Sequence, residues 1–166
     1  MAIALLIKPL DVVKHTSLSG AIDTDKIIQF IEIAQDIHLQ SYTGTKLLNK
    51  IKTDVIAGTL SGNYLALTTN YLKPMLIHWT MVEFLPFHAY MISNGGIGKH
   101  TSENSETVSK FDVDFLVEKQ RSLAESYSSR FVDYICYNQT LFPEYNTNTT
   151  SDIYPKNDTN LGGWRL

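Results

Sequence analysis

Apolar side chains in the first third of the chain recur every three or four residues, the spacing that places them on one face of an α-helix. A first helix is expected to begin at residues 23–25, because Asp and Thr side chains accept hydrogen bonds from the free N–H groups of a helix start. The polar run 41–44 ends this helix, and Thr45 can cap a second one that continues to Gly58. The pattern therefore predicts two consecutive helices.

The most hydrophobic stretch lies in the middle of the chain. Residues 64–72 predict one helix, and Pro74 suits the first turn of another, since its ring presets φ and its missing N–H is not needed there. This second helix continues to Tyr90, and Pro86 is expected to kink it. A helix that is apolar over most of its circumference is buried. We therefore expect it at the centre of the fold.

A last long helix is predicted from Asp112, its expected cap, to an end between Asn138 and Phe142. Its predicted core face consists of ten residues: Val113, Leu116, Val117, Gln120, Leu123, Ala124, Tyr127, Phe131, Tyr134 and Ile135. Together the patterns predict an all-α fold, a bundle of four to five helices that forms a helical domain over residues 1–142.

Two segments lack this helical spacing. Residues 93–109 are rich in Gly, Ser, Asn and Thr and predict a long, exposed, glycine-containing loop, with short extended pieces around Ile97 left open. Residues 143–166 are rich in Asn and Thr, whose side chains compete for backbone hydrogen bonds, and predict an irregular C-terminal arm. The arm also carries several large apolar residues: Tyr145, Ile153, Tyr154, Leu161, Trp164 and Leu166. We therefore expect it to order against another surface, and its removal to leave the helical domain folded.

Composition and charge exclude several classes of function. The net charge of −3 argues against a nucleic-acid surface, which normally carries a basic excess. Cys136 is the single cysteine, so an intramolecular disulfide is impossible and a cysteine-based zinc site is not expected. The apolar run at residues 2–7 is too short for a signal peptide or a membrane span, so the chain is expected to be soluble and intracellular.

No catalytic, cofactor or metal site is predicted. The segment 93–101 resembles a phosphate-binding loop only superficially, because Ser93 replaces its first glycine and His100 follows Lys99 where Ser or Thr is required. The five histidines include no pair at the i, i+4 spacing of a helical metal site. A helical enzyme with a site near His78, Glu83 and His88, on one shared face, is a more distant hypothesis.

The order of elements resembles the head–tail connector (adaptor, or head-completion) proteins of tailed bacteriophages, in particular those of phages of Bacteroidetes, including crAss-like phages. The resemblance spans residues 5–142. It rests on a helix, a Thr-Gly break and a second helix within residues 23–51, a glycine turn after a long apolar helix, and a last helix. The residues that carry it are Ala34, Leu39, Thr43, Gly44, Leu47, Leu48, Gly95, Gly96, Ile97, Ala124, Tyr127 and Phe131.

This resemblance implies a structural protein without a catalytic site or cofactor. It implies a homo-oligomeric ring of about twelve copies in the phage neck, at the head–tail junction of the virion, assembled in the host cytoplasm. The ring would join the portal protein to the tail or to the next neck component, and DNA would pass through it without sequence-specific contact. No membrane is involved. Partner contacts are expected from the arm and the glycine loop, at Tyr154, Leu161, Trp164, Arg165, Leu166, Gly95, Gly96, Ile97 and Lys99. The alternative is a bacterial helical protein-interaction or regulatory module that binds one partner through the same arm.

Overall fold

The computed structural model describes residues 4–18, 22–88, 90–93, 96–99, 109–147 and 152–156, with side chains described outside the segment 90–99. In chain order the elements are α1 (Pro9–His15), α2 (Asp25–Ala34), the π-helical turn η1 (Gln35–Leu39), α3 (Gln40–Ala57), α4 (Gly62–Leu67), the π-helical turn η2 (Thr68–Leu72), α5 (Lys73–His88), β1 (Tyr90–Ser93), β2 (Gly96–Lys99), α6 (Lys110–Tyr137), the 3₁₀ turn η3 (Gln139–Leu141) and α7 (Pro143–Asn146). The fold is an all-α bundle, as the sequence predicts, with one added β-hairpin.

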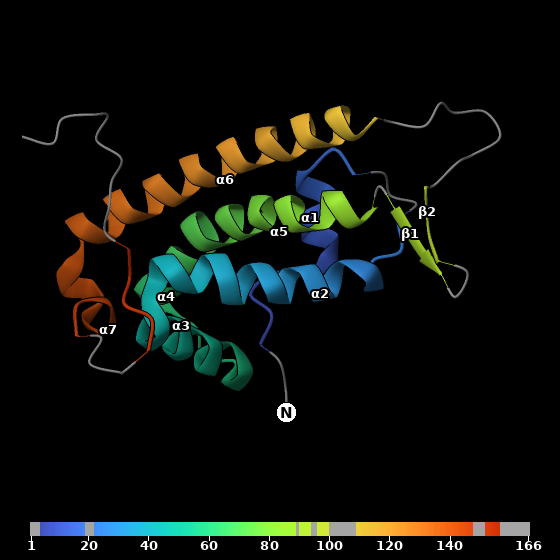
Figure 1. Ribbon diagram of the computed structural model, residues 1–166. Helices are drawn as coiled ribbons and strands as arrows, with labels where there is room; N and C mark the ends of the chain where they lie inside the picture. Colours follow the sequence, from blue (N-terminus) through green and yellow to red (C-terminus); the bar gives the residue numbers. More distant parts are fainter. Residues whose placement is uncertain are drawn as a thin grey trace, which may run out of the picture.

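Helix α5 is the centre of the bundle. Figure 1 shows it lying between α2 and α6, and α1 also packs against α5 and α2. Side chains on every side of α5 are buried, among them Met75, Leu76, Trp79 and Phe84. The central position expected from its hydrophobicity is therefore confirmed. The N-terminal apolar run packs into the same core through Leu6 and Ile7.

The predicted break between the first two helices is a single residue. Helix α2 continues through η1 into α3, and the backbone leaves helical geometry only at Gly44, with φ 72° and ψ 159°. This conformation is open to glycine and strained for other residues. Thr43, Gly44 and Thr45 are all buried, so the chain turns a tight corner, residues 40–45, without a connecting loop.

Replacing Gly44 by alanine is expected to lower the free energy of unfolding by about 1–3 kcal/mol, because a residue with a Cβ is strained at this φ and ψ. The measurement is urea unfolding followed by circular dichroism. Gly58→Ala is the matched control: its φ of 67° is also positive, but with ψ 22° it lies in the left-handed helical region, which other residues adopt at smaller cost than the region of Gly44. The expectation is contradicted if Gly44→Ala proves no more costly than Gly58→Ala.

The break expected between residues 72 and 74 is absent, and this prediction was wrong. The N–H of Lys73 donates to the C=O of Thr68, five residues back, so the wide turn η2 joins α4 to α5 directly. A proline in an α-helix lacks the N–H and clashes with the carbonyl four residues earlier. The π-helical turn immediately before Pro74 lets the helix continue through it. Pro86 also lies within α5, which ends two residues later at His88.

A β-hairpin lies where the predicted central helix meets the predicted loop: β2 is an extended piece around Ile97, which the sequence left open, whereas β1 begins at Tyr90, where the helix was expected to end. Strands β1 and β2 are antiparallel, with Tyr90 opposite Lys99 and Ser93 opposite Gly96. The dipeptide Asn94-Gly95 lies between them in sequence, and Asn-Gly between short extended runs is a strong hairpin signal. Figure 1 shows the hairpin projecting at one end of the bundle, between α5 and α6.

Helix α6 begins earlier than predicted and buries a narrower face. Ser109, not Asp112, is the N-cap: its hydroxyl accepts from the N–H of Asp112, whose carboxylate accepts in turn from the N–H of Ser109. Of the ten predicted core residues, Leu116 and Leu123 are about half exposed instead. The reason is that α6 packs mainly on one neighbour, α5, so that only a narrow stripe of the helix is covered.

The chain after Phe142 is not irregular throughout, which corrects the expectation for residues 143–147. Helix α7 packs against α3, and Tyr145 is buried with its ring 6.4 Å from that of Phe131. Pro143 stands at the first position of this short helix, where proline is favoured. The first residues of the predicted arm therefore contribute to the core.

Candidate functional site

A line of polar and aromatic contacts joins α5 to its neighbours on the side of η1. The ring of His38 stacks on that of Trp79 with centroids 3.9 Å apart, and its Nε2 lies 2.7 Å from Oε1 of Glu83. On the other edge of the indole, Nε1 of Trp79 donates to Oγ of Ser128, 3.0 Å away on α6. The ring nitrogen of His38 and the indole N–H of Trp79 both have hydrogen-bond partners. These contacts therefore join η1, α5 and α6 without leaving either nitrogen unsatisfied.

The three residues of the enzyme hypothesis do not meet. Glu83 faces His38, whereas Nδ1 of His78 lies 2.8 Å from Oε1 of Gln120 on α6. His88 stacks on Phe84, with ring centroids 4.8 Å apart. The shared face expected for this trio is therefore wrong, because Glu83 is five residues from each histidine and a helix turns about 500° over five residues. Within the described parts of the chain, no group of three His, Cys, Asp or Glu side chains could hold a metal ion.

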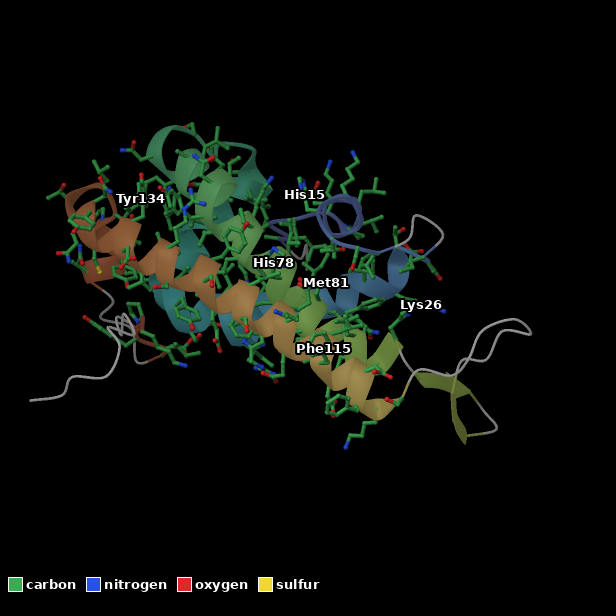
Figure 2. All side chains as sticks on the ribbon, turned by 90° about the horizontal axis from the view of Figure 1, so that it is seen from above. His15, Lys26, His78, Met81, Phe115 and Tyr134 are labelled. Atoms are coloured by element: carbon green, nitrogen blue, oxygen red, sulfur yellow. The ribbon has the colours of Figure 1, made fainter. Side chains whose placement is uncertain are left out.

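A cavity of about 450 Å³ lies between α1, α5 and α6. Its floor is Pro74 and Ile77, and one wall is the stacked pair His78 and Tyr127, with ring centroids 5.2 Å apart. Polar groups surround it: Asp11, His15, Thr69 and Lys73. Figure 2 labels His15 on α1 and His78 on α5, which lie on the same side of α6.

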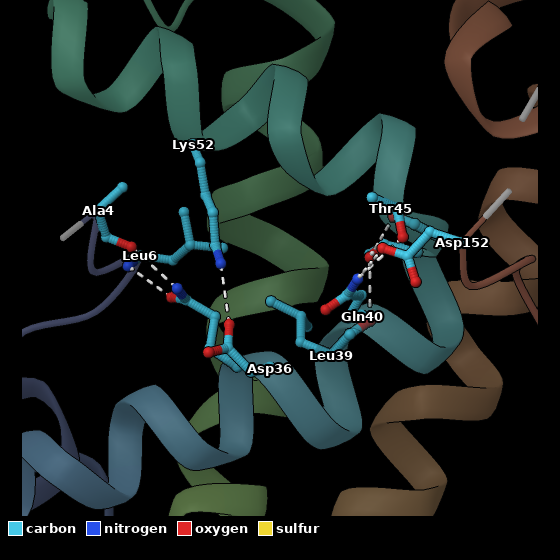
Figure 3. A network of polar contacts seen from close by, with 11 residues as sticks. Ala4, Leu6, Asp36, Leu39, Gln40, Thr45, Lys52 and Asp152 are labelled. Carbon is cyan, nitrogen blue, oxygen red and sulfur yellow. Dashed lines mark hydrogen bonds and ion pairs between the residues drawn. The ribbon is translucent and has the colours of Figure 1, made fainter. Parts of the chain in front are cut away.

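Residues 152–156, here called the strap, bind across the corner at residues 40–45. The C=O of Ile153 accepts from the N–H of Thr45 at 3.1 Å, and the N–H of Lys156 donates to the C=O of Ser41 at 2.9 Å. Figure 3 shows Gln40 reaching both Thr45 and Asp152. The strap thus supplies hydrogen-bond partners to backbone groups that the turn at Gly44 takes out of the helical ladder.

The same figure shows a second connection between distant segments. The side chain of Gln35 is buried and binds the N-terminal segment twice: its Oε1 accepts from the N–H of Leu6 and its Nε2 donates to the C=O of Ala4. Beside it, Lys52 of α3 pairs with Asp36 of η1. Contacts from α3 and from both terminal segments therefore hold the region around η1 and the corner.

The structure places only part of the predicted partner-binding set. Tyr154 lies in the strap with 60% of its surface exposed, so it is available to another molecule. Gly96, Ile97 and Lys99 form the backbone of β2. The remaining residues of the set lie outside the described residues: Gly95, Leu161, Trp164, Arg165 and Leu166.

Sequence reasoning missed an exposed apolar surface on the first half of α6, which we call the α6 surface. Phe111 is 79% exposed and Phe115 is 56% exposed, and these two rings form the surface; Leu116 and Leu123 are also exposed, but they lie roughly 110° further around the helix. The signal was present in the sequence. The two phenylalanines are four residues apart and so share a helix face, but that face is nearly opposite the one that carries Val117 and Phe131.

Tyr64 connects α4 to α7 and predicts a dependence of stability on pH. Its O–H donates to Oε2 of Glu144 at 2.5 Å, and burial together with this carboxylate raises the pKa of Tyr64 to about 12 from 10.0. Between these values the unfolded chain ionises Tyr64 and the folded chain does not. The contribution of Tyr64 to the free energy of unfolding is therefore fully present below pH 10 and is lost as the pH rises toward 12. We expect Tyr64→Phe to reduce this loss in urea unfolding at several pH values; an unchanged pH dependence would refute the assignment.

The fold and its contacts define a helical protein whose prominent surface features are an apolar helix face, a projecting hairpin and a strap formed by its C-terminal segment. The chain belongs to the family described as "Family of unknown function (DUF6712)", whose model matches residues 39–155, well over half of the sequence. The match begins one residue before the corner and ends in the strap, so it includes the hydrogen bond between Thr45 and Ile153, whereas Lys156 lies one residue beyond it. No curated protein and no solved structure matches the chain. In the described residues, no helix is both long and apolar enough to cross a membrane.

Proposed function

We propose that this chain is a structural protein of a tailed-phage virion. In this proposal it is a head–tail connector that forms a ring of about twelve copies and joins the portal to the tail or to the next neck component. The observation that carries the proposal is the α6 surface. A pair of phenylalanines exposed on the far side of a helix contributes nothing to the core of its own bundle, and exposed apolar patches mark contact sites between proteins.

The distribution of exposed apolar residues supports a ring better than a two-fold dimer. Ile33 and Ile37 are exposed on α2 and η1, and Figure 1 shows α2 and α6 on different sides of α5. Two different apolar faces on one subunit suit a head-to-tail contact, in which one face of each copy meets the other face of the next. Such contacts generate closed rings when the rotation between copies closes.

The proposal is tested by native mass spectrometry of the purified chain over a concentration series, with and without a candidate portal protein. A species of about twelve copies, formed alone or only on the portal, would support the connector. A monomer or dimer that ignores both concentration and portal would refute it, and would favour the alternative of a helical regulatory module with one partner.

The α6 surface makes the prediction specific. Phe111→Ser combined with Phe115→Ser is expected to raise the concentration needed for assembly at least about tenfold, because buried aromatic anchors contribute about 2 kcal/mol or more each at interfaces. Tyr137→Ser is the matched control, since Tyr137 is also exposed, at 91%, but lies at the other end of the same helix. Equal loss of assembly in the double variant and in the Tyr137→Ser control would show that the α6 surface is not the contact between copies.

A further inference from the structure

The cavity between α1, α5 and α6 is unused by the contacts described so far. We propose that it receives residues 161–166 of a neighbouring copy of the chain, with Trp164 entering the cavity and Arg165 pairing with Asp11. This inference rests on the proposed assembly of several copies. It assigns a specific acceptor to the apolar residues that follow the strap in sequence.

The lining of the cavity matches the chemistry of this segment. Pro74, Ile77 and the ring of Tyr127 form an apolar surface on which an indole can be buried, and aromatic side chains contribute most where they leave water. Asp11 accepts from the N–H of Lys8 through Oδ2, and among the described residues no hydrogen bond or ion pair uses its Oδ1, which leaves that oxygen for a cation at the rim. A guanidinium suits this role because it donates several hydrogen bonds in one plane.

The positive charge of Lys73 in the cavity also has an oppositely charged residue available in the C-terminal segment, Asp158. Lys73 has no ion pair in the described part of the chain, and no ion pair joins it to Asp11 across the cavity. Residues 157–166 contain one acid, Asp158, and one base, Arg165, separated by a sequence that includes Gly162-Gly163. The glycines allow the chain to turn, so that Asp158 can approach Lys73 while Arg165 approaches Asp11.

The location of the strap favours a neighbouring copy over the same chain. Lys156 is bound to Ser41, in the corner that follows η1, and η1 packs on the side of α5 that carries Trp79 and Glu83. The cavity lies instead over Ile77 and His78, which face α1 and α6. The strap is therefore bound on a different side of α5 from the cavity, and the ten residues after Lys156 span at most roughly 33–36 Å. A neighbouring copy in a ring can present its cavity directly to this segment.

The test is disulfide trapping in the full-length protein. In a Cys136→Ser background, Thr69→Cys places a thiol at the rim of the cavity and Gly163→Cys places one beside Trp164. Mild oxidation is expected to give chain-to-chain disulfides on non-reducing gels, in yields at least about fivefold higher than with Asn70→Cys in place of Thr69→Cys. Asn70 is the matched control because it is the next residue, is also exposed and is not among the residues that line the cavity.

Further outcomes separate this inference from the proposed ring. Adding Trp164→Ala should reduce the trapped yield several-fold, while circular dichroism shows an unchanged fold. Equal yields from Thr69→Cys and Asn70→Cys, or a disulfide formed within one chain, would overturn the inference. Rings seen by native mass spectrometry without specific trapping would support the connector and refute the cavity contact. Specific trapping between copies that form no ring would support the cavity contact and refute the connector.

Discussion

Truncation of the chain after Phe142 is expected to lower the free energy of unfolding by at least about 3–5 kcal/mol, the usual cost of removing a large aromatic side chain from a core. Tyr145 is 2% exposed and would be lost, and so would Glu144, the hydrogen-bond partner of Tyr64. Phe142 itself, fully buried in the intact chain, would become the new terminus. The helical domain therefore depends on residues that the sequence pattern places in an arm outside it.

The matched comparison is truncation after Lys156. This shorter deletion keeps α7, the strap and every contact described for them, so its unfolding midpoint in urea is expected to equal that of the full chain. A truncation after Thr147 separates the two contributions, because it keeps α7 and removes the strap. If the chain ending at Phe142 unfolds at the same urea concentration as the full chain, the packing of α7 against α3 contributes nothing to stability and the prediction fails.

Trp79→Ala is expected to have an effect of similar size, about 3–5 kcal/mol of unfolding free energy. The indole is 5% exposed, stacks on His38 and donates to Ser128, so its removal opens a cavity where η1, α5 and α6 meet. Circular dichroism in urea is the suitable measurement, since the chain contains a second tryptophan, Trp164, whose fluorescence would obscure the change.

Two substitutions separate packing from hydrogen bonding at this position. Trp79→Phe keeps an aromatic ring against His38 and removes the N–H, so a smaller loss is expected than for alanine. Ser128→Ala removes the acceptor and leaves the indole N–H buried without a partner, which costs about 1–3 kcal/mol. Trp79→Ala costing no more than Ser128→Ala would show that the stacked packing is unimportant.

The strap and the α6 surface make different contributions to the proposed assembly. The strap is held by backbone hydrogen bonds at the corner, so it fixes the point from which residues 157–166 leave the bundle. The α6 surface lies on a rigid helix and needs no ordering before it binds. A rigid face together with a tethered segment gives two linked contacts, and linked contacts strengthen binding through effective concentration.

The sequence by itself predicted most of the helical segments and the break at Gly44, because both are local; it missed α7 and predicted a break before Pro74 that the structure lacks. Apolar residues at helical spacing define a face wherever the chain folds, and few residues other than glycine tolerate the backbone angles of the turn. The central place of α5 was equally predictable, since a helix that is apolar on all sides has to be covered on all sides.

Only the tertiary structure decided which apolar faces are covered. Leu116 and Leu123 have the same spacing as true core residues, and they stay exposed because α6 has one main neighbour. Tyr145 and the strap show no helical period, yet they are bound because α3 and the corner offer them a surface. His78 and Glu83 diverge for the same reason, each toward a partner far away in sequence. Local spacing says which side chains share a face, whereas the packing of distant segments decides what that face meets.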